Sequence, residues 1–254
     1  MGSWAIELIT TSDGSHTLYS KQFDQHYHSV KEGALNESLS KHVIPAFHYH
    51  KDKKELTILD ICFGIGYNSF ATLYYIQTNN LDIKVNIYSP EFDLALLHSI
   101  KDFTFPKEFE SLKTIIHEIS QNLYYEDEKC KIEIYNGDAR EYLKILNTKE
   151  ILFDIVYQDA FSSEVNRLLW TQEYFGQIKN ILNDDAIIST YSIATPIRLS
   201  IYNNDINIYE YKPDSSNRIT LALNKQQIDK NYKYIDMELK QQRNKTAIAL
   251  KDKE

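Results

Sequence analysis

The sequence predicts an α/β protein with a mainly parallel, doubly wound sheet and an antiparallel hairpin at one edge. Short, nearly continuous apolar runs recur along the chain, and such runs are typical of strands that are buried on both faces. Each run is followed by a stretch with helical periodicity, and alternating strands and helices require crossover connections between parallel strands. With 254 residues, the chain is long enough to bury one sizeable core.

Five strand–helix units are expected from Leu56 onward. The predicted strands are LTILDI, VNIYSPE, KIEIYNGD, FDIVYQDAF and AIISTYS, which begin at residues 56, 85, 131, 153 and 186. Helices are expected up to residue 76 and over 94–103, 139–146, 171–182 and 196–202. Two further runs, INIYEYK and RITLALN, can pair as the edge hairpin. Sheets of this kind bind ligands beyond the carboxyl ends of their strands, so functional residues are expected directly after each strand.

The first 54 residues have shorter, mixed patterns. The runs WAIELITT and HTLYS flank Asp13-Gly14 and predict a hairpin. A helix is expected over 36–47 and should end near Pro45, because the residue before a proline disfavours the helical conformation. We therefore expect residues 1–54 to form an extension over the ligand site of an α/β domain at 55–254, with both in one structural unit.

The composition argues against several classes of protein. No apolar stretch approaches the roughly eighteen residues of a membrane span, and the N-terminus has no signal-peptide pattern. Cys62 and Cys130 lack the spacing of a zinc site or a disulfide framework, so a reduced, cytoplasmic environment is expected. His26 and His28 stand two residues apart, but no further ligand cluster accompanies them, and no metal site is expected.

The charge is unevenly distributed along the chain. The net charge of −8 disfavours a general nucleic-acid binder, which would normally be basic. Residues 211–254, however, contain ten Lys and Arg against six Asp and Glu, a net +4 that leaves −12 on the rest. This asymmetry is compatible with a basic surface that contacts phosphates, and equally with a solvated C-terminal face.

A glycine loop follows the first predicted strand. In Asp60-Ile-Cys-Phe-Gly64-Ile-Gly66, the two glycines allow a sharp turn and a close approach of the backbone to a ligand. Asn68 and Ser69 stand where a dinucleotide-binding loop would carry its third glycine. By itself, the loop is also compatible with a plain connection between a strand and a helix.

Acidic residues end the next three strands. Glu91 follows the glycines by about twenty-five residues, where a carboxylate can accept both hydroxyls of a ribose. Asp138 can accept the exocyclic amine of adenine, with Ala139 at the adenine edge, and Asp159 ends the fourth strand. Each acid has an alternative role as a helix N-cap. In this order and spacing, however, the residues suit an adenosyl ligand and resemble the Rossmann-like class I S-adenosylmethionine methyltransferases.

Three segments carry a narrower resemblance. The first is N-terminal and comprises DGSHTL from Asp13 and HYHSVKEGALNES from His26. The second is FGIGYN from Phe63, and the third is DAFSSEVNRLLWT from Asp159. Together they resemble the bacterial tRNA methyltransferases that complete 5-methylaminomethyl-2-thiouridine at the wobble position. The likeness extends from about residue 10 to residue 223. Two prolines of that family's loop appear here as Ser163 and Arg167, which indicates a differently shaped loop over the substrate.

The resemblance implies an S-adenosyl-L-methionine-dependent N-methyltransferase that converts 5-aminomethyl(-2-thio)uridine to 5-methylaminomethyl(-2-thio)uridine in tRNA. It also implies a stand-alone methyltransferase without the fused flavin oxidase domain, whose aminomethyl substrate a separate enzyme would make. Whether the uridine is thiolated stays open. The residues expected to bind the cofactor are Tyr27, Ser29, Glu37, Asp60, Phe63, Gly64, Gly66, Asn68, Glu91, Asp138, Ala139 and Asp159. Those expected at the substrate are Phe161, Trp170 and Tyr191.

Asp159 is the expected catalytic residue. A primary aminomethyl group is largely protonated near neutral pH and must lose a proton before it attacks a sulfonium methyl group. A carboxylate at Asp159 can accept the hydrogen bond of the amine and orient its lone pair, or it can take the proton. The sequence leaves both roles open.

Two other functions stay open at this stage. A polyamine aminopropyltransferase would share the sheet and would also place an amine against a sulfonium. Its usual Asp-x-x-Asp-Pro loop differs from the segment 154–161 here, in which no proline follows Asp159. The other alternative is a catalytically silent RNA-binding module on the same fold, and the acidic net charge argues against it.

Overall fold

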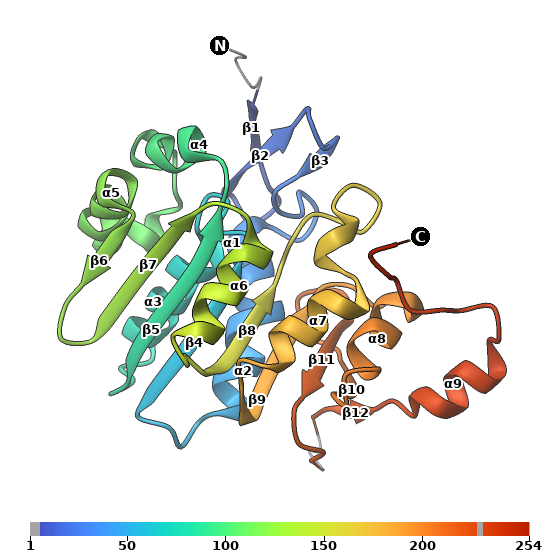
Figure 1. The fold of residues 1–254 in the computed structure, drawn as a ribbon. Coiled ribbons are helices and arrows are strands. Elements are labelled where there is room, and N and C mark those ends of the chain that lie inside the picture. The colour runs from blue at the N-terminus through green and yellow to red at the C-terminus, as the bar shows by residue number, and fades with distance from the viewer. Residues whose placement is uncertain (1–5, 228–230, 254) are drawn as a thin grey trace.

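The computed structural model describes residues 6–227 and 231–253 (Figure 1). In this part of the chain, one nine-stranded sheet has the strand order β12-β10-β11-β9-β8-β4-β5-β7-β6. Its five central strands are parallel: β9 (Leu182–Thr190), β8 (Phe153–Gln158), β4 (Glu55–Ile61), β5 (Lys84–Glu91) and β7 (Cys130–Asn136). Antiparallel strands flank them: β11 (Ile219–Leu223), β10 (Asn207–Tyr211) and β12 (Lys233–Tyr234) at one edge, and β6 (Tyr124–Glu126) at the other. The predicted fold class, including the edge hairpin, is confirmed.

Helices cover both faces of the sheet (Figure 1). Their side chains belong to two separate hydrophobic clusters, because successive residues of a strand point to opposite faces. The first cluster draws on α1 (Ala34–Glu37), α2 (Ile44–Tyr49), α3 (Tyr67–Thr78), α4 (Leu94–Ser99) and α5 (Lys113–Asn122). The second draws on α6 (Ala139–Thr148), α7 (Gln172–Lys179), α8 (Thr195–Tyr202) and α9 (Met237–Arg243).

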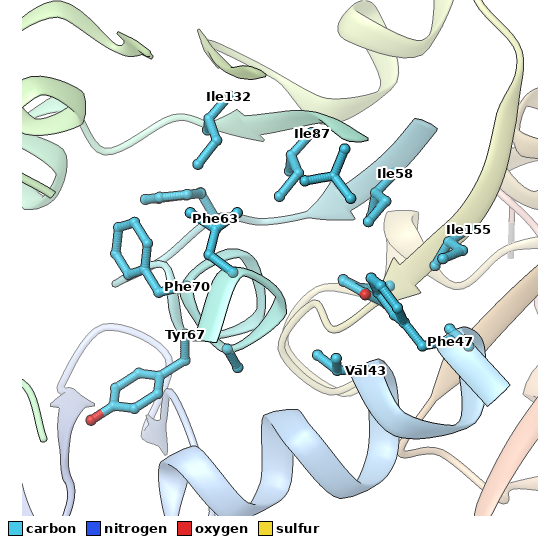
Figure 2. Packing of buried hydrophobic residues seen from close by; sticks show 14 of the residues in the cluster. Val43, Phe47, Ile58, Phe63, Tyr67, Phe70, Ile87, Ile132 and Ile155 are labelled. Atoms are coloured by element: carbon cyan, nitrogen blue, oxygen red, sulfur yellow. The ribbon is translucent and has the colours of Figure 1, made fainter. Parts of the chain in front are cut away.

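The segment before β4 shares its core with the sheet. Figure 2 shows Val43 and Phe47 from this segment in one cluster with Phe70 of α3 and with Ile58 and Ile155 from neighbouring strands. These side chains are 5% exposed or less, so the N-terminal helices are an integral part of the core. This packing supports the interpretation of the extension and the α/β domain as one structural unit.

The strand order reverses at the centre of the sheet. From β4 the chain proceeds to β5 and β7 on one side, then crosses back to β8 and β9 on the other. Ligand crevices in such sheets lie at this reversal, beyond the carboxyl ends of the strands. The loops that follow β4 and β8 meet there, and they carry the glycine pair and Asp159.

The helical segment before β4 differs from the prediction at its end. Pro45 does not end it, because the hydrogen-bond register changes in a π-helical stretch, Ser38–Val43, between α1 and α2. Pro45 thereby falls in the first turn of α2, where its missing N–H is tolerated. The helix expected over 94–103 is also shorter, since a 3-10 turn, Ile100–Asp102, follows α4. The sequence patterns do not predict α5 or β6.

Both ends of the described chain add to the α/β body. The predicted hairpin is present as β1 (Ile6–Thr10) and β2 (His16–Ser20), and a short third strand, β3 (Gln25–His26), extends it. Trp4 and Ala5 of the predicted first strand lie outside the described residues. Near the C-terminus, the Leu250 carbonyl accepts the N–H of Gln172 at 2.8 Å, so this segment lies against α7. Over the described ranges, no helix has the length and apolar character to cross a membrane.

Candidate active site

A cavity of about 490 Å³ opens at the carboxyl ends of β4, β5 and β8. Cavities of this size are typical of sites for small molecules and cofactors. The segment 25–31 forms one wall, and two reciprocal hydrogen bonds of 2.6 and 3.1 Å connect Gln25 to Ser162 in the loop after β8. Ten of the predicted residues line the cavity: Tyr27, Ser29, Glu37, Phe63, Gly64, Asn68, Glu91, Asp159, Phe161 and Tyr191. Five do not: Asp60, Gly66, Asp138, Ala139 and Trp170.

The glycine loop after β4 requires both of its glycines. Gly64 and Gly66 have φ angles of +56° and +84°, in the left-handed region that glycine adopts at low cost. A Cβ atom on Gly66 would lie 2.5 Å from the Phe70 ring, and one on Gly64 would lie 3.1 Å from the Tyr27 ring. Gly64 therefore leaves room for the Tyr27 ring at the cavity. Gly66 does not line the cavity, and it shapes the turn that leads into α3.

Glu91 is held at the end of β5 by backbone N–H groups. Its Oε2 accepts the N–H of Gly64 at 2.8 Å, and its Oε1 accepts the N–H of Asp93 at 2.9 Å. Burial raises the pKa of Glu91, while these hydrogen bonds oppose the shift. Each carboxylate oxygen retains a second lone pair, so Glu91 can accept two neighbouring hydroxyls from the cavity.

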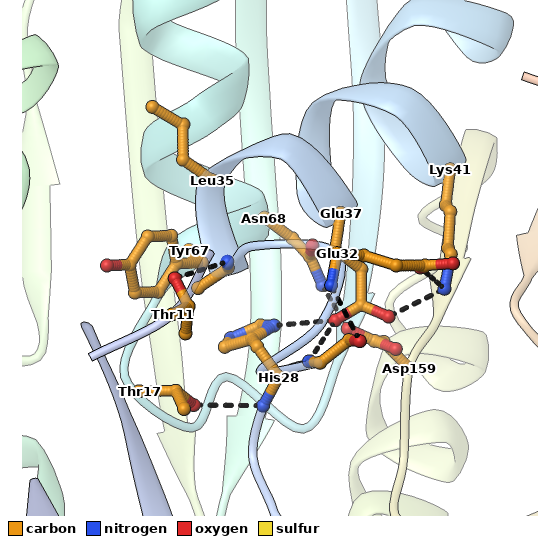
Figure 3. A network of polar contacts seen from close by, with 12 residues as sticks. Thr11, Thr17, His28, Glu32, Leu35, Glu37, Lys41, Tyr67, Asn68 and Asp159 are labelled. Atoms are coloured by element: carbon orange, nitrogen blue, oxygen red, sulfur yellow. Dashed lines mark hydrogen bonds and ion pairs between the residues drawn. The ribbon is translucent and has the colours of Figure 1, made fainter. Parts of the chain in front are cut away.

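Asp159 directly follows β8, and Figure 3 shows Asn68 beside its carboxylate. Its Oδ2 accepts a hydrogen bond from Asn68 Nδ2 at 2.9 Å, and its Oδ1 lies 3.5 Å from His42 Nε2. Burial favours the neutral acid, but His42, His28 and the Asn68 hydrogen bond outweigh it and hold the pKa of Asp159 below its usual value. Asp159 therefore presents a negative charge to the cavity at neutral pH.

His42 is a site residue that the sequence does not reveal. It is fully buried in the π-helical stretch, and its Nδ1 lies 2.8 Å from the hydroxyl of Ser189 on β9, within hydrogen-bonding distance. π-helical turns are frequent at functional sites, but no sequence pattern predicts them. Only the packing of the N-terminal helices on the sheet brings His42 to Asp159.

Charged residues of both signs gather around Glu37 at one end of the cavity (Figure 3). The Glu37 carboxylate accepts the N–H of Ser29 at 2.6 Å and pairs with Lys41 at 2.7 Å. Lys41 also pairs with Glu32 at 2.5 Å, and His28 Nδ1 lies 3.8 Å from Glu37. Burial lowers the pKa of His28, while the charges of Asp159 and Glu37 oppose the shift. Among these residues, Glu37, Ser29 and His28 line the cavity, whereas Lys41 and Glu32 do not.

Aromatic rings cover the cavity beside Asp159. The Phe161 ring lies 5.0 Å from the Tyr27 ring and 4.9 Å from the Phe23 ring, measured between centroids. Tyr191 donates a hydrogen bond from its hydroxyl to the carbonyl of Ala160 at 3.0 Å. The expectation that Trp170 lines the cavity is not met, because its side chain is fully buried in the core. Its indole N–H donates to the Phe161 carbonyl at 2.7 Å and so fixes the backbone of the lining residue.

Two predicted acids lie behind the cavity wall or beside it. Asp60 is buried and accepts hydrogen bonds from Ser69 at 2.7 Å and from Asn68 at 3.4 Å. Burial raises the pKa of Asp60 to about 7. Because its carboxylate contacts Asn68 and does not line the cavity, Asp60 orients Asn68 and does not contact the ligand. Asp138 caps α6 by accepting two backbone N–H groups at 2.9 and 3.0 Å, the alternative role considered above. The contact of Asp138 and Ala139 with adenine stays a prediction.

A family model and a solved structure match this architecture. Residues 106–225 match the family described as S-adenosyl-L-methionine-dependent methyltransferase. The crystal structure of MnmC2 from Aquifex aeolicus is 28% identical with a TM-score of 0.84, over 98% of this chain and 79% of that one. The chain is an S-adenosylmethionine-dependent methyltransferase.

Two curated proteins are also similar to this methyltransferase. An uncharacterized protein of Methanocaldococcus jannaschii is 31% identical over 219 residues, 85% of this chain and 58% of the relative. The tRNA 5-methylaminomethyl-2-thiouridine biosynthesis bifunctional protein MnmC of Leptospira borgpetersenii is 26% identical over 217 residues, 79% of this chain and 31% of the relative. The chain thus spans less than two thirds of both relatives. Together with MnmC2, they confirm the family resemblance that the motifs predict.

The cavity of the methyltransferase fits S-adenosylmethionine. Gly64 leaves space where a side chain would approach Tyr27, and the buried Oδ1 of Asn68 has no hydrogen-bond partner among the described residues. We propose that Glu91 holds the ribose hydroxyls and that the charged end around Glu37 holds the zwitterionic methionine part. The lone pairs of Glu91 and the carboxylate of Glu37, which can accept the ammonium group, support this orientation.

We expect the methyltransferase to bind one S-adenosylmethionine per chain, and Glu91→Ala to weaken that binding by about 1.5–3 kcal/mol. The loss follows from removing hydrogen bonds to a charged acceptor. Calorimetry with S-adenosylmethionine and S-adenosylhomocysteine measures it. Glu133→Ala on β7, a partly exposed glutamate that does not line the cavity, is the control. An unchanged affinity in Glu91→Ala would move the ribose contact to another residue.

Proposed function

We propose that this methyltransferase converts the 5-aminomethyl group of a wobble uridine in tRNA to 5-methylaminomethyl. The observation that carries the proposal is the carboxylate of Asp159, which lines the cofactor cavity beside aromatic rings and whose pKa its neighbours hold below the usual value. An aminomethyl group arrives as a cation, and a buried anion attracts it and accepts its hydrogen bond. The printed name of the Leptospira relative supports tRNA as the acceptor. A separate catalytic unit is proposed to supply the aminomethyl group.

The residues around Asp159 suit the transfer of a methyl group to an amine. S-adenosylmethionine supplies an electrophilic methyl group on a sulfonium, so the protein's main task is alignment. Asn68 donates a hydrogen bond to one oxygen of the Asp159 carboxylate, and His42 lies 3.5 Å from the other. The carboxylate can then hold the amine by one N–H and direct its lone pair. The same carboxylate can take the amine's proton. Phe161 and Tyr27 form a wall that keeps water from this point.

The structure argues against the aminopropyltransferase alternative. An aminopropyltransferase usually carries a second aspartate in the Asp-x-x-Asp-Pro loop at this position. Asp154, at the other end of β8, is instead engaged by Lys53 at 2.6 Å and by the N–H of Thr57 at 2.8 Å. Gln158, directly before Asp159, is fully buried and accepts the hydroxyl of Tyr174 at 2.7 Å. Of the acidic residues in the described segment 153–161, Asp159 is therefore the one that lines the cavity.

In a strain that lacks this methyltransferase, we expect 5-aminomethyluridine, with or without the 2-thio group, to accumulate in tRNA. The methylaminomethyl nucleoside should disappear in the same proportion, because the amine has no other route to its methyl group. Nucleoside mass spectrometry of digested tRNA measures both and also shows whether the uridine is thiolated. Reintroducing the wild-type gene should restore the product, and reintroducing Asp159→Asn should not.

Unchanged levels of both nucleosides would contradict the proposed substrate. The silent-module alternative predicts a different result from purified components. A catalytically silent protein would bind tRNA but transfer no labelled methyl group from S-adenosylmethionine to tRNA from the deletion strain. Transfer to that tRNA, and none to wild-type tRNA that already carries the methyl group, would exclude this alternative.

A further inference from the structure

A second cavity, of about 430 Å³, lies at the sheet edge formed by β10 and β12, between α8 and α9. It is separate from the cofactor cavity, with which it shares no lining residue. Five basic residues and two acids line it: Arg198, Arg218, Lys233, Lys240 and Arg243 against Glu210 and Asp236. We call this cavity the basic groove. Its net charge of +3 contrasts with −8 for the whole chain.

The buried guanidinium of Arg198 forms the floor of the basic groove. Its side chain is 2% exposed, and its Nε donates to Thr220 Oγ1 at 2.8 Å. Its Nη2 has no hydrogen-bond partner among the described residues and lies 3.5 Å from Glu210. Burial lowers the pKa of Arg198, Glu210 opposes the shift, and Arg218 adds to it. A buried cationic donor with an open hydrogen-bonding position favours an anionic partner.

The acids of the basic groove do not neutralise its cations. Asp236 caps α9 by accepting the N–H of Leu239 at 2.8 Å. Glu210 is shared between Arg198 and Arg218, at 3.5 and 3.4 Å.

Within residues 6–227 and 231–253, the remaining cations of the groove have no acidic partner. In the described ranges, no ion pair or side-chain hydrogen bond engages Lys233, Lys240 or Arg243. Burial lowers the pKa of Lys240, and the nearby charge of Arg198 lowers it further, while Glu210 opposes the shift.

The basic groove is physically connected to the active site. Thr220, which accepts from Arg198, donates its own hydroxyl to the Ser192 carbonyl at 2.6 Å. Ser192 is the neighbour of Tyr191, which lines the cofactor cavity. The basic groove and the cofactor cavity therefore flank the same segment of chain, which directly follows β9.

We propose that the basic groove binds a phosphate of the RNA backbone while the acceptor nucleoside occupies the cofactor cavity. This inference rests on the proposed function, because that function supplies the RNA. Guanidinium groups donate two parallel hydrogen bonds to phosphate oxygens, and an ammonium adds a point charge. The groove offers both kinds of group on a protein that is otherwise acidic. It therefore anchors the acceptor where the overall charge would repel it.

The test uses tRNA from the deletion strain and the variants Lys240→Gln and Arg243→Gln on α9. Equilibrium binding is measured across a series of salt concentrations. Each variant should lower the slope of log affinity against log salt by about 1, and should weaken binding roughly tenfold at about 0.1 M salt. Lys113→Gln on α5, an exposed lysine at the opposite edge of the sheet, is the matched control and should change neither quantity.

Two further measurements separate the possible results. The S-adenosylmethionine affinity of each variant should equal that of the wild type, which shows that the fold is intact. Glu210→Gln should tighten tRNA binding, because it removes the acid that the groove's arginines share. If Glu210 has a purely structural role, Glu210→Gln should instead weaken or abolish tRNA binding.

The outcomes for the basic groove and for the proposed function are distinguishable. If the α9 variants bind and methylate tRNA like the wild type, the groove proposal is wrong and the proposed function stands. If the variants weaken binding but even the wild type methylates no tRNA, the groove stands and the proposed function fails. If inorganic phosphate stabilises the wild type but neither variant, while tRNA binding is equal in all three, the groove binds free phosphate and the RNA proposal is overturned.

Discussion

Asp159→Asn is expected to slow methyl transfer by roughly 10²–10⁴-fold, the usual contribution of a positioned acid–base group. The asparagine keeps the shape of the side chain but removes the charge that holds the amine. Affinity for S-adenosylmethionine should stay within a few-fold, because we assign the ribose to Glu91 and the methionine part to the end around Glu37. The loss should shrink at higher pH, since more of the free amine is already unprotonated before it binds.

Single-turnover rates at saturating tRNA, measured across pH, test this expectation. The competing role for Asp159 is a helix cap, whose loss would cost about 1 kcal/mol of stability and leave the rate nearly intact. The structure disfavours that role, because the helical turn that follows begins at Arg167 and has Asn166 at its N-cap position. Asp93→Asn, which alters the acid that caps α4, is the matched control and should affect stability alone. If Asp159→Asn has a lower melting temperature but transfers methyl groups at the wild-type rate, the catalytic role is contradicted.

The predictable part of the site lies at the strand ends. The apolar runs of β4, β5 and β8 are short and bounded by polar residues, so their carboxyl ends can be located within a few positions. Parallel strands bring these ends to one edge of the sheet, which is why Gly64, Glu91 and Asp159 line one cavity. Asp138 also ends a strand and is predicted at the same cavity, but a strand-end acid can equally well cap a helix, and Asp138 does so.

The unpredictable part joins elements whose relative position no local pattern encodes. His42 reaches Asp159 because a π-helical stretch rotates the helix by an extra residue before it packs on the sheet. The basic groove brings Arg198 of α8 to Lys240 of α9 across β10 and β12, and β12 has only two residues. A strand that short has no periodicity to detect. The excess of cations after residue 211 is visible in the sequence, but the contribution of the buried Arg198 is not.

His42→Ala is expected to slow methyl transfer by roughly 10²-fold at neutral pH, through misplacement of the Asp159 carboxylate. His42 is a positioning residue: it lies behind Asp159 and does not line the cavity. Burial alone would raise the pKa of Asp159, and His42 makes the largest contribution that opposes this. Without His42 the pKa of Asp159 rises, so more of the acid is protonated at a given pH. The acid limb of the pH–rate profile should therefore move to higher pH.

His42→Gln and Ser189→Ala make the expectation specific. A glutamine amide can reach Asp159 as a neutral donor, so His42→Gln should recover part of the rate while its acid limb stays displaced toward higher pH. Ser189→Ala removes the Ser189 hydroxyl, which lies 2.8 Å from His42 Nδ1, and should have a smaller effect in the same direction. Rates are compared at temperatures where melting curves show each variant to be folded, because His42 is fully buried and its truncation leaves a cavity. If His42→Ala melts earlier but keeps both the wild-type rate and the wild-type acid limb, His42 supports only the fold, and Asp159 is positioned by Asn68.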